Sequence, residues 1–236
     1  MTLTKKRRGI VIGIFWAHLL VLFPPLQASA WELISDTNGI KVESRSIPGE
    51  DLLMVRGTTV FHHPIEKVFT LMIDHRTRKE WVDRLSYIKR IKELDGKLDA
   101  ISHYKVNMPW PVKDRDFVVR TYITYDEKGE EITSHTASVQ GALPPSDDFV
   151  RALSHDSTVV LKKLGSGKTR ITMQARVDPK GNLPVFLVNY FQKRWASATL
   201  VSLASALDSL DIVPNKAYDR LVTGEYTNKP KVKMTL

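Results

Sequence analysis

The stretch GSGKT at residues 165–169 comes nearest, in this sequence, to a known chemical motif, because it resembles the end of a phosphate-binding loop. Such a loop also needs a glycine where this chain has Lys162, and a helix must follow it. Thr169 instead opens an alternating apolar pattern that is typical of a strand. We therefore interpret the stretch as a hairpin turn and expect no nucleotide site there.

No other pattern predicts catalysis or a cofactor. The chain has no cysteine, which excludes disulfides, thiol catalysis and cysteine metal sites. It also has no Gly-x-Ser-x-Gly nucleophile elbow, which leaves open only a triad assembled from distant residues. We expect no catalytic residue, no metal and no cofactor, because the histidines after residue 30 include no pair at the i, i+4 spacing of a helical metal site: His62, His63, His75, His103, His135 and His155.

Two pairs of carboxylates have the residue types for acid–base chemistry. Asp147 and Asp148 follow two prolines and a serine, which is typical of a solvated turn. Asp114 and Asp116 belong to the stretch PWPVKDRDF at residues 109–117, where two prolines flank Trp110 and an apolar run follows. By its residue types alone, this stretch is a turn, a catalytic loop or a lid.

The first thirty residues have the layout of a secretory signal peptide. Four basic residues at 5–8 precede an apolar run that ends before Pro24, and residues 28–30 form a small-residue cleavage site. The apolar run is shorter than the roughly 20 residues that a spanning helix needs. We expect cleavage after Ala30 and export, to the periplasm of a Gram-negative cell or to the outside. A retained membrane anchor is the alternative.

The charge of the chain limits its partners. The sequence has 35 Lys and Arg against 26 Asp and Glu, a net charge of +9, and the signal segment carries four of the basic residues, which leaves +5. This mild excess favours approach to an anionic membrane surface. The basic clusters at 89–92 and 229–233 contain no aromatic stacking platform, so we expect solvated faces and no nucleic-acid partner.

Apolar periodicity predicts a fold of the α+β class. Helical spacing predicts one helix at 64–83 and another at 183–210. Turn residues and alternating apolar positions predict strands at 39–46, 52–61, 87–94, 99–107, 117–125, 131–139, 159–164 and 169–177. Because the strands follow one another as hairpins, we expect a curved antiparallel sheet with the long last helix lying across it.

The last helix has an apolar stripe and an apolar beginning. Its stripe runs through Ala196, Leu200, Leu203, Leu207 and Leu210. Its first turns are apolar nearly all round, which predicts that they are buried or cover an apolar surface. We expect a monomeric domain at 31–213, followed by a loosely attached basic tail at 214–236.

Four stretches, in the same order, resemble the START domain family, the lipid-transfer module related to the steroidogenic acute regulatory protein. DHRTRKEWVDRL has an arginine three residues before a tryptophan, Arg78 and Trp81, and PWPVKDRDFV follows it. DDFVRALSHDSTVVLKKL and DPKGNLPVFLVNYF come later, the second with Lys180 where the family has the first glycine of a Pro-Gly-Gly turn. The resemblance covers roughly residues 39–210.

This resemblance implies a helix-grip fold, in which a strongly bent antiparallel sheet wraps the C-terminal helix around a hydrophobic tunnel for one lipid. It also implies non-enzymatic binding and transfer of a sterol, a phospholipid or a similar apolar ligand. In the family, PWPVKDRDF lies where a loop covers the tunnel mouth. Trp110 would then shield the ligand, and Arg115 with Asp116 would fix the loop through a charge-assisted bond.

Residues of such a cavity can be nominated from their types. Arg120 is one candidate, because sterol-binding members carry a buried arginine on this strand. It lies four residues after Asp116, however, and this parity predicts that it faces away from Val119 and Ile123 unless a bulge turns the strand. For each of the other candidates, plain core packing is the alternative: Trp81, Tyr104, Met108, Trp110, Met173, Phe191 and Trp195.

Three functions follow as hypotheses. The leading one is an exported carrier that takes up a lipid, encloses it and releases it during transient contact with a membrane. The alternative is a helix-grip enzyme, such as a cyclase or hydrolase, which a convergence of Asp116, Arg120 and His135 inside the cavity would favour. A structural or regulatory protein, filled by its own side chains, would have no tunnel under the helix.

Overall fold

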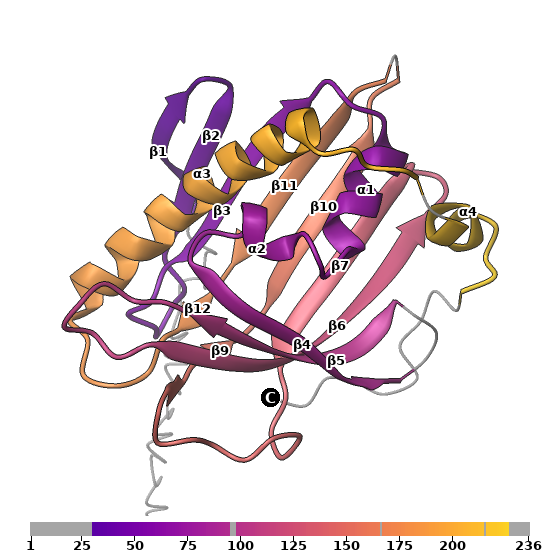
Figure 1. Ribbon diagram of the computed structural model, residues 1–236. Coiled ribbons are helices and arrows are strands. Elements are labelled where there is room, and N and C mark those ends of the chain that lie inside the picture. The colour runs from indigo at the N-terminus through magenta and orange to yellow at the C-terminus, as the bar shows by residue number, and fades with distance from the viewer. Residues whose placement is uncertain (1–29, 95–97, 166, 215, 227–236) are drawn as a thin grey trace, which may run out of the picture.

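One large antiparallel sheet carries a long helix across one face in the computed structural model, which describes residues 30–94, 98–165, 167–214 and 216–226 (Figure 1). Residues 1–29 of the predicted signal peptide and the last ten residues of the predicted tail lie outside these ranges. The sheet follows the order β1-β2-β3-β11-β10-β7-β6-β5-β4, and the short β8 pairs with β6 in parallel. Its strands are β1 (Glu32–Thr37), β2 (Ile40–Arg45), β3 (Met54–Phe61), β4 (Leu85–Glu93), β5 (Asp99–Val106), β6 (Arg115–Asp126), β7 (Glu131–Ser138), β8 (Val150–Arg151), β10 (Ser157–Lys163) and β11 (Thr169–Ala175).

The helices gather on one face of this sheet (Figure 1). They are α1 (Ile65–Ile73), α2 (Arg78–Trp81), α3 (Val185–Ser209) and α4 (Lys216–Val222), and a small second sheet pairs β9 (Leu153–Ser154) with β12 (Val177–Asp178). α3 packs on β2, β3 and α2, whereas α1 packs on β10. Within the described ranges, no helix combines the length and the apolar character that crossing a membrane requires.

The predicted α+β class, with its antiparallel sheet and its long C-terminal helix, is confirmed. The apolar stripe of α3 is buried at Ala196, Leu200, Leu203 and Leu207. GSGKT lies at the connection between the antiparallel strands β10 and β11, so the hairpin interpretation is confirmed as well. Alternation and turn residues therefore specified most of the sheet correctly.

Two local predictions are wrong. The single helix at 64–83 breaks at Asp74, whose carboxylate accepts a bond from the backbone N–H of Arg76 at 2.9 Å, so a local side-chain bond replaces the helical one. β1 was not predicted, although Asn38 and Gly39 have φ of 53° and 73° and form the Asn-Gly turn that marks a two-residue hairpin.

The two ends of the α3 region also differ from the sequence predictions. Phe186 and Tyr190, in the first turns of α3, are 75% and 55% exposed, whereas Val188 is buried, so the prediction for this end holds on one side of the helix only. Beyond α3, the segment expected to be a loose tail begins with α4, where Leu221 is buried in the main core. A seven-residue helix is too short for its periodicity to stand out in the sequence.

Gly57 sets how closely α3 approaches the sheet. A Cβ atom at this position would lie 2.9 Å from Cδ1 of Leu200 and 3.4 Å from the Cβ of Ala196. Because both partners are fully buried, neither can move away freely. The helix therefore rests directly on β3 at this point.

We expect Gly57→Ala to lower the free energy of unfolding by about 1–3 kcal/mol, because an added methyl group overpacks this contact. Urea denaturation measures the change. The penalty should shrink when Leu200→Ala makes room in the same chain, which a double-mutant cycle tests. An unchanged stability in the single variant would contradict the close approach.

Candidate ligand-binding cavity

A cavity of about 60 Å³ lies between α1, α2 and the helix-bearing face of the sheet. Strand alternation builds its floor, because Ala100, Ser102 and Tyr104 share one face of β5, and Thr121 and Ile123 continue this face on β6. β4, β7 and β10 complete the floor, and α1 forms the roof. No residue of α3 lines this cavity.

The cavity has a largely apolar end, where Ser134 on β7 pairs with Ile123 on β6, and a charged end at Arg78. Leu98, Ile123, Ile132 and Phe69 line the apolar end, where the backbone N–H of Ile123 donates to the carbonyl of Leu98. Tyr104 lies at the other end, six residues after Leu98 in the chain. Six residues of extended strand span about 20 Å. The lining therefore matches an amphiphile, with one polar group and one apolar chain.

Arg78 is the main charge at the polar end. Its Nη1 donates to the Tyr104 hydroxyl at 3.0 Å, its Nη2 donates to the carbonyl of Met72, and its guanidinium carbon lies 5.6 Å from the centroid of the Trp81 ring. Its Nε is buried and has no hydrogen-bond partner among the described residues. A planar donor with spare hydrogen-bonding capacity suits an oxygen anion.

Acidic side chains are missing from the described lining of the cavity. Arg90, the second arginine there, differs from Arg78 because it forms an ion pair with Glu93 at 2.6 Å. Arg78 forms no ion pair with any carboxylate in the described part of the chain. The positive charge of Arg78 therefore faces a cavity whose described lining contains no carboxylate to neutralise it.

His75 adds no charge near neutral pH. Burial, followed by the nearby charges of Arg78 and Arg90, lowers the pKa of His75 to about 4. The imidazole is thus neutral at pH 7, and it offers one donor and one acceptor to a ligand.

Of the nominated wall residues, only Tyr104 lines this cavity. Trp81 is buried beneath Arg78, and Met173 is buried in the main core. Phe191 and Trp195 lie half-buried on α3, which packs directly against β3 at Gly57. The predicted tunnel beneath the C-terminal helix is therefore displaced in this structure to the space beneath α1 and α2.

The loop at 107–114 is anchored at both ends and exposed at its tip. Met108 is half-buried, and its backbone N–H donates to Asp114 at 2.8 Å, whereas Trp110 is 93% exposed. Arg115 donates to the carbonyls of Pro179 and Lys180 at 3.1 and 3.0 Å, and so fixes the turn that precedes α3. The predicted cooperation of Arg115 with Asp116 is wrong, because neighbouring strand residues point to opposite faces.

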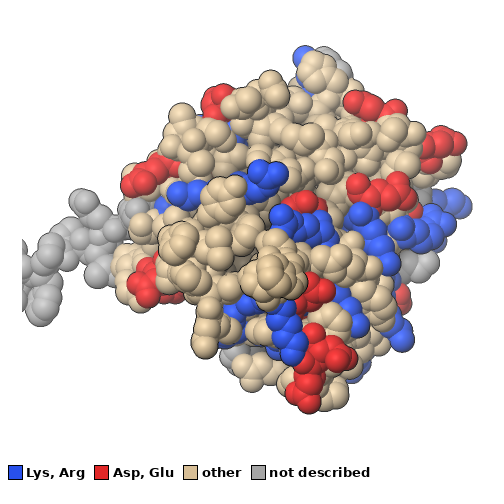
Figure 2. All heavy atoms as spheres, turned by 60° about the vertical axis from the view of Figure 1, so that its left-hand side comes forward, with Lys and Arg blue, Asp and Glu red and all other residues tan. Residues whose placement is uncertain are grey.

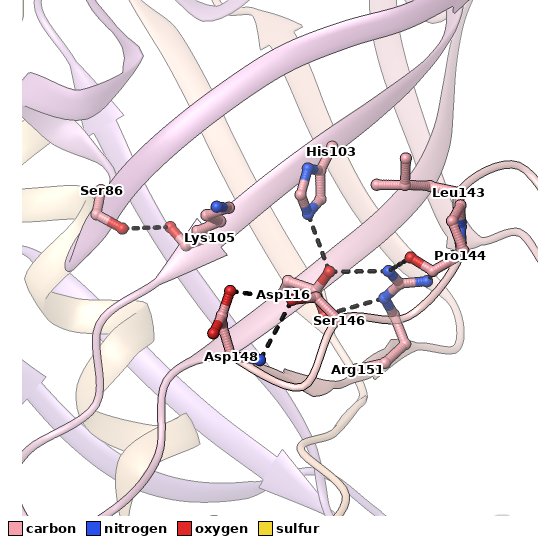
Figure 3. A network of polar contacts seen from close by, with 9 residues as sticks. All are labelled: Ser86, His103, Lys105, Asp116, Leu143, Pro144, Ser146, Asp148 and Arg151. Carbon is pink, nitrogen blue, oxygen red and sulfur yellow. Dashed lines mark hydrogen bonds and ion pairs between the residues drawn. The ribbon is translucent and has the colours of Figure 1, made fainter.

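Asp116 instead holds a loop to the far face of the sheet (Figure 3). Arg151 donates to both carboxylate oxygens of Asp116 at 2.9 Å and to the carbonyls of Leu143 and Pro144, and His103 lies 2.9 Å from the same carboxylate. Burial disfavours the ionised form, but the bonds from Arg151 and His103 outweigh it and lower the pKa of Asp116. The carboxylate is therefore a structural anion.

Arg120 also lies on the far face, as its parity predicts. It forms a buried bidentate pair with Asp99, at 2.8 and 2.6 Å. His135 stacks on Tyr122 with the ring centroids 4.7 Å apart, again outside the cavity lining. The cluster of Asp116, Arg120 and His135 that would have favoured an enzyme thus does not form inside the cavity.

Comparison with known proteins identifies the family. Residues 19–210 match the START domain family. This chain belongs to that family. An uncharacterized protein of Pseudomonas aeruginosa is 28% identical to it over 182 residues, which cover 77% of this chain and 88% of that protein.

Two further proteins that resemble this START domain are named as lipid transfer proteins. The phosphatidylcholine transfer protein of Bos taurus is 22% identical over 189 residues, which cover 78% of this chain and 86% of that protein. The solved STAR-related lipid transfer protein of Xanthomonas axonopodis superposes with a TM-score of 0.69 at 24% identity, over 76% of this chain and 99% of that chain. The second comparison shows that the fold is shared.

Sequence reasoning missed most of the polar end of this START domain's cavity. Arg78 was noticed as part of a family motif but was not nominated, and His75 and Arg90 were considered only as a possible metal ligand and a surface charge. Ser102 shares the strand face of Tyr104, so alternation alone was a sufficient signal for it.

We expect the START domain to lose stability as the pH falls from 6.5 towards 4, because the unfolded chain takes up a proton at His75 that the folded chain excludes. After allowance for solvent screening, the loss from this group is about 1–2 kcal/mol. His75→Phe should reduce the loss, and His62→Gln, at an exposed histidine, should retain it. Urea denaturation across this pH range is the measurement. Equal pH dependence in the wild type and His75→Phe would contradict the burial of a neutral imidazole.

Proposed function

We propose that this START domain is an exported lipid carrier that binds one lipid by a phosphate or carboxylate group in its head and transfers it between membranes. The observation that carries the proposal is Arg78, a guanidinium with spare donors in a cavity wall without acidic residues. The name of the phosphatidylcholine transfer protein supports a phospholipid as ligand. The predicted signal peptide supports export.

Arg78 also determines how the lipid would lie. With the head group at Arg78 and Tyr104, the acyl chain runs along β5 towards Leu98. Each buried methylene contributes about 0.8 kcal/mol, so a chain of ordinary length accounts for strong retention. The charge-assisted bond to the head group then selects an amphiphile over a plain hydrocarbon.

Lipid uptake requires the walls of the cavity to separate. Its volume of about 60 Å³ is far below the roughly 300–1,000 Å³ of typical ligand pockets. α1 forms the roof, and the break at Asp74 gives that roof a non-helical joint. The same narrowness favours a second candidate, a structural protein filled by its own side chains, which binds no lipid at all.

Membrane contact is proposed for the end of the molecule where α3 begins. Trp110 and Phe186 expose aromatic rings there, and Arg115 ties the base of the Trp110 loop to the turn before α3. Exposed Lys113 and Lys180 lie on the same two segments. Figure 2, which brings this side forward, shows broad uncharged surface with lysine and arginine side chains beside it. Aromatic rings flanked by cations suit an anionic membrane interface.

We expect Arg78→Gln to weaken binding of a monoalkyl phosphate by about 10–100-fold, because a charge-assisted hydrogen bond is lost. Isothermal titration calorimetry measures the affinity, with inorganic phosphate as a control ligand that should not bind. Arg76→Gln, two residues away at an exposed arginine, is the matched control variant.

A wild-type protein that binds neither the alkyl phosphate nor any lipid extracted from its host would favour the structural candidate. Equal affinities for the wild type and Arg78→Gln would remove Arg78 from the head-group site while leaving lipid binding intact.

We expect the double variant Trp110→Ala, Phe186→Ala to bind phosphatidylglycerol vesicles at least about tenfold more weakly, because two rings no longer enter the interface. Vesicle cosedimentation measures the binding. The unfolding midpoint should stay nearly constant, since both rings are exposed. Val213→Ala, at an exposed valine beyond the other end of α3, should bind like the wild type. If Val213→Ala lost as much vesicle binding as the double variant, a docking surface localised at Trp110 and Phe186 would be contradicted.

A further inference from the structure

The chain continues past residue 210, where the match to the family ends, into a helix behind one wall of the cavity. α4 contacts both α1 and β6 (Figure 1). Leu221 is buried, and the ring of Tyr218 meets Phe69 edge to face, with the centroids 6.2 Å apart. Phe69 in turn lines the cavity, so α4 supports that wall from outside.

This wall closes the apolar end. Phe69 lies there together with Leu98, Ile123 and Ile132, and the opposite end carries Arg78 and Tyr104. An acyl chain with its head group at Arg78 would therefore approach Phe69 with its last methylene groups. Past Phe69, the next side chain is Tyr218.

Polar contacts, in addition to packing, hold Tyr218 in place. Burial, and then the charge and hydrogen bond of Glu66 on α1, raise the pKa of Tyr218 to about 12. The phenol therefore stays protonated and joins α4 to α1 over the whole physiological pH range. Tyr226, which follows α4, packs against the same core and holds the far end of the segment.

We propose that α4 sets the length of the acyl chain that the cavity accepts, with Tyr218 as the specificity-determining residue. This inference rests on the proposed lipid-binding function. Tyr218 keeps Phe69 against the cavity, so a chain that reaches Phe69 has no apolar space beyond it. Without the tyrosine ring, Phe69 can move outward into the space that the ring leaves, and the chain gains room for further methylene groups.

The test compares the full-length wild type with Tyr218→Ala by calorimetric titration of monoalkyl phosphates of increasing chain length. Wild-type affinity should rise with each methylene and then stop rising at a limiting length. In Tyr218→Ala the rise should continue beyond that length, by about fourfold for each added methylene. Tyr218→Phe keeps the ring and should keep the wild-type limit.

The outcomes separate this inference from the function on which it rests. The same limiting length in the wild type and in a folded Tyr218→Ala would overturn the role of α4 and leave lipid binding standing. No binding by the wild type at any chain length would overturn the lipid-binding proposal, and this inference with it. Circular dichroism monitors folding. If Tyr218→Ala does not fold, Tyr218→Leu replaces it in the test, because leucine leaves a smaller gap. Tyr218→Leu should also raise the limiting chain length. An unchanged limiting length in this variant would overturn the inference.

Discussion

The direct contact of α3 with β3 at Gly57 is the constraint on which the rest of the structure depends. With no side chain at Gly57, Ala196 and Leu200 reach the strand itself, and α3 fills the space above β2 and β3. The cavity that Arg78 lines lies further across the sheet, beneath α1 and α2. Gly57 thus lets α3 occupy the face of β2 and β3, and the cavity floor lies on β4, β5, β6, β7 and β10.

Arg78 differs from the arginines on the far face of the sheet in how its charge is balanced. On the far face, Arg120 pairs with Asp99 and Arg151 pairs with Asp116, so each buried charge is neutralised by a bidentate partner. On the cavity face, Arg78 has only neutral oxygens as partners. Buried pairs that are fully bonded fix structure, and the proposed head-group site rests on the contrast with Arg78, which has no carboxylate partner in the described part of the chain.

Strand alternation and helical periodicity could be predicted from the sequence. Which buried arginine has a carboxylate partner could not. Alternation gave the correct face for Arg120, and the helical period gave the buried stripe through Leu200. The break at Asp74 was missed because one side-chain bond outweighed a good helical pattern. The lack of a carboxylate partner for Arg78 depends on residues far apart in the chain, and so does the exposure of Trp110. No local pattern encodes either one.

The position of β11 between β3 and β10 has a consequence for the order of folding. Thr58 on β3 meets Thr172 on β11, 114 residues later in the chain, and α3, which packs on β2 and β3, follows β11 in the chain. Closing so long a loop costs entropy that only the finished sheet repays, which makes such topologies slow to fold. The strands β1, β2 and β3 thus pair only with one another until β11, from the last third of the chain, joins them to the rest of the sheet.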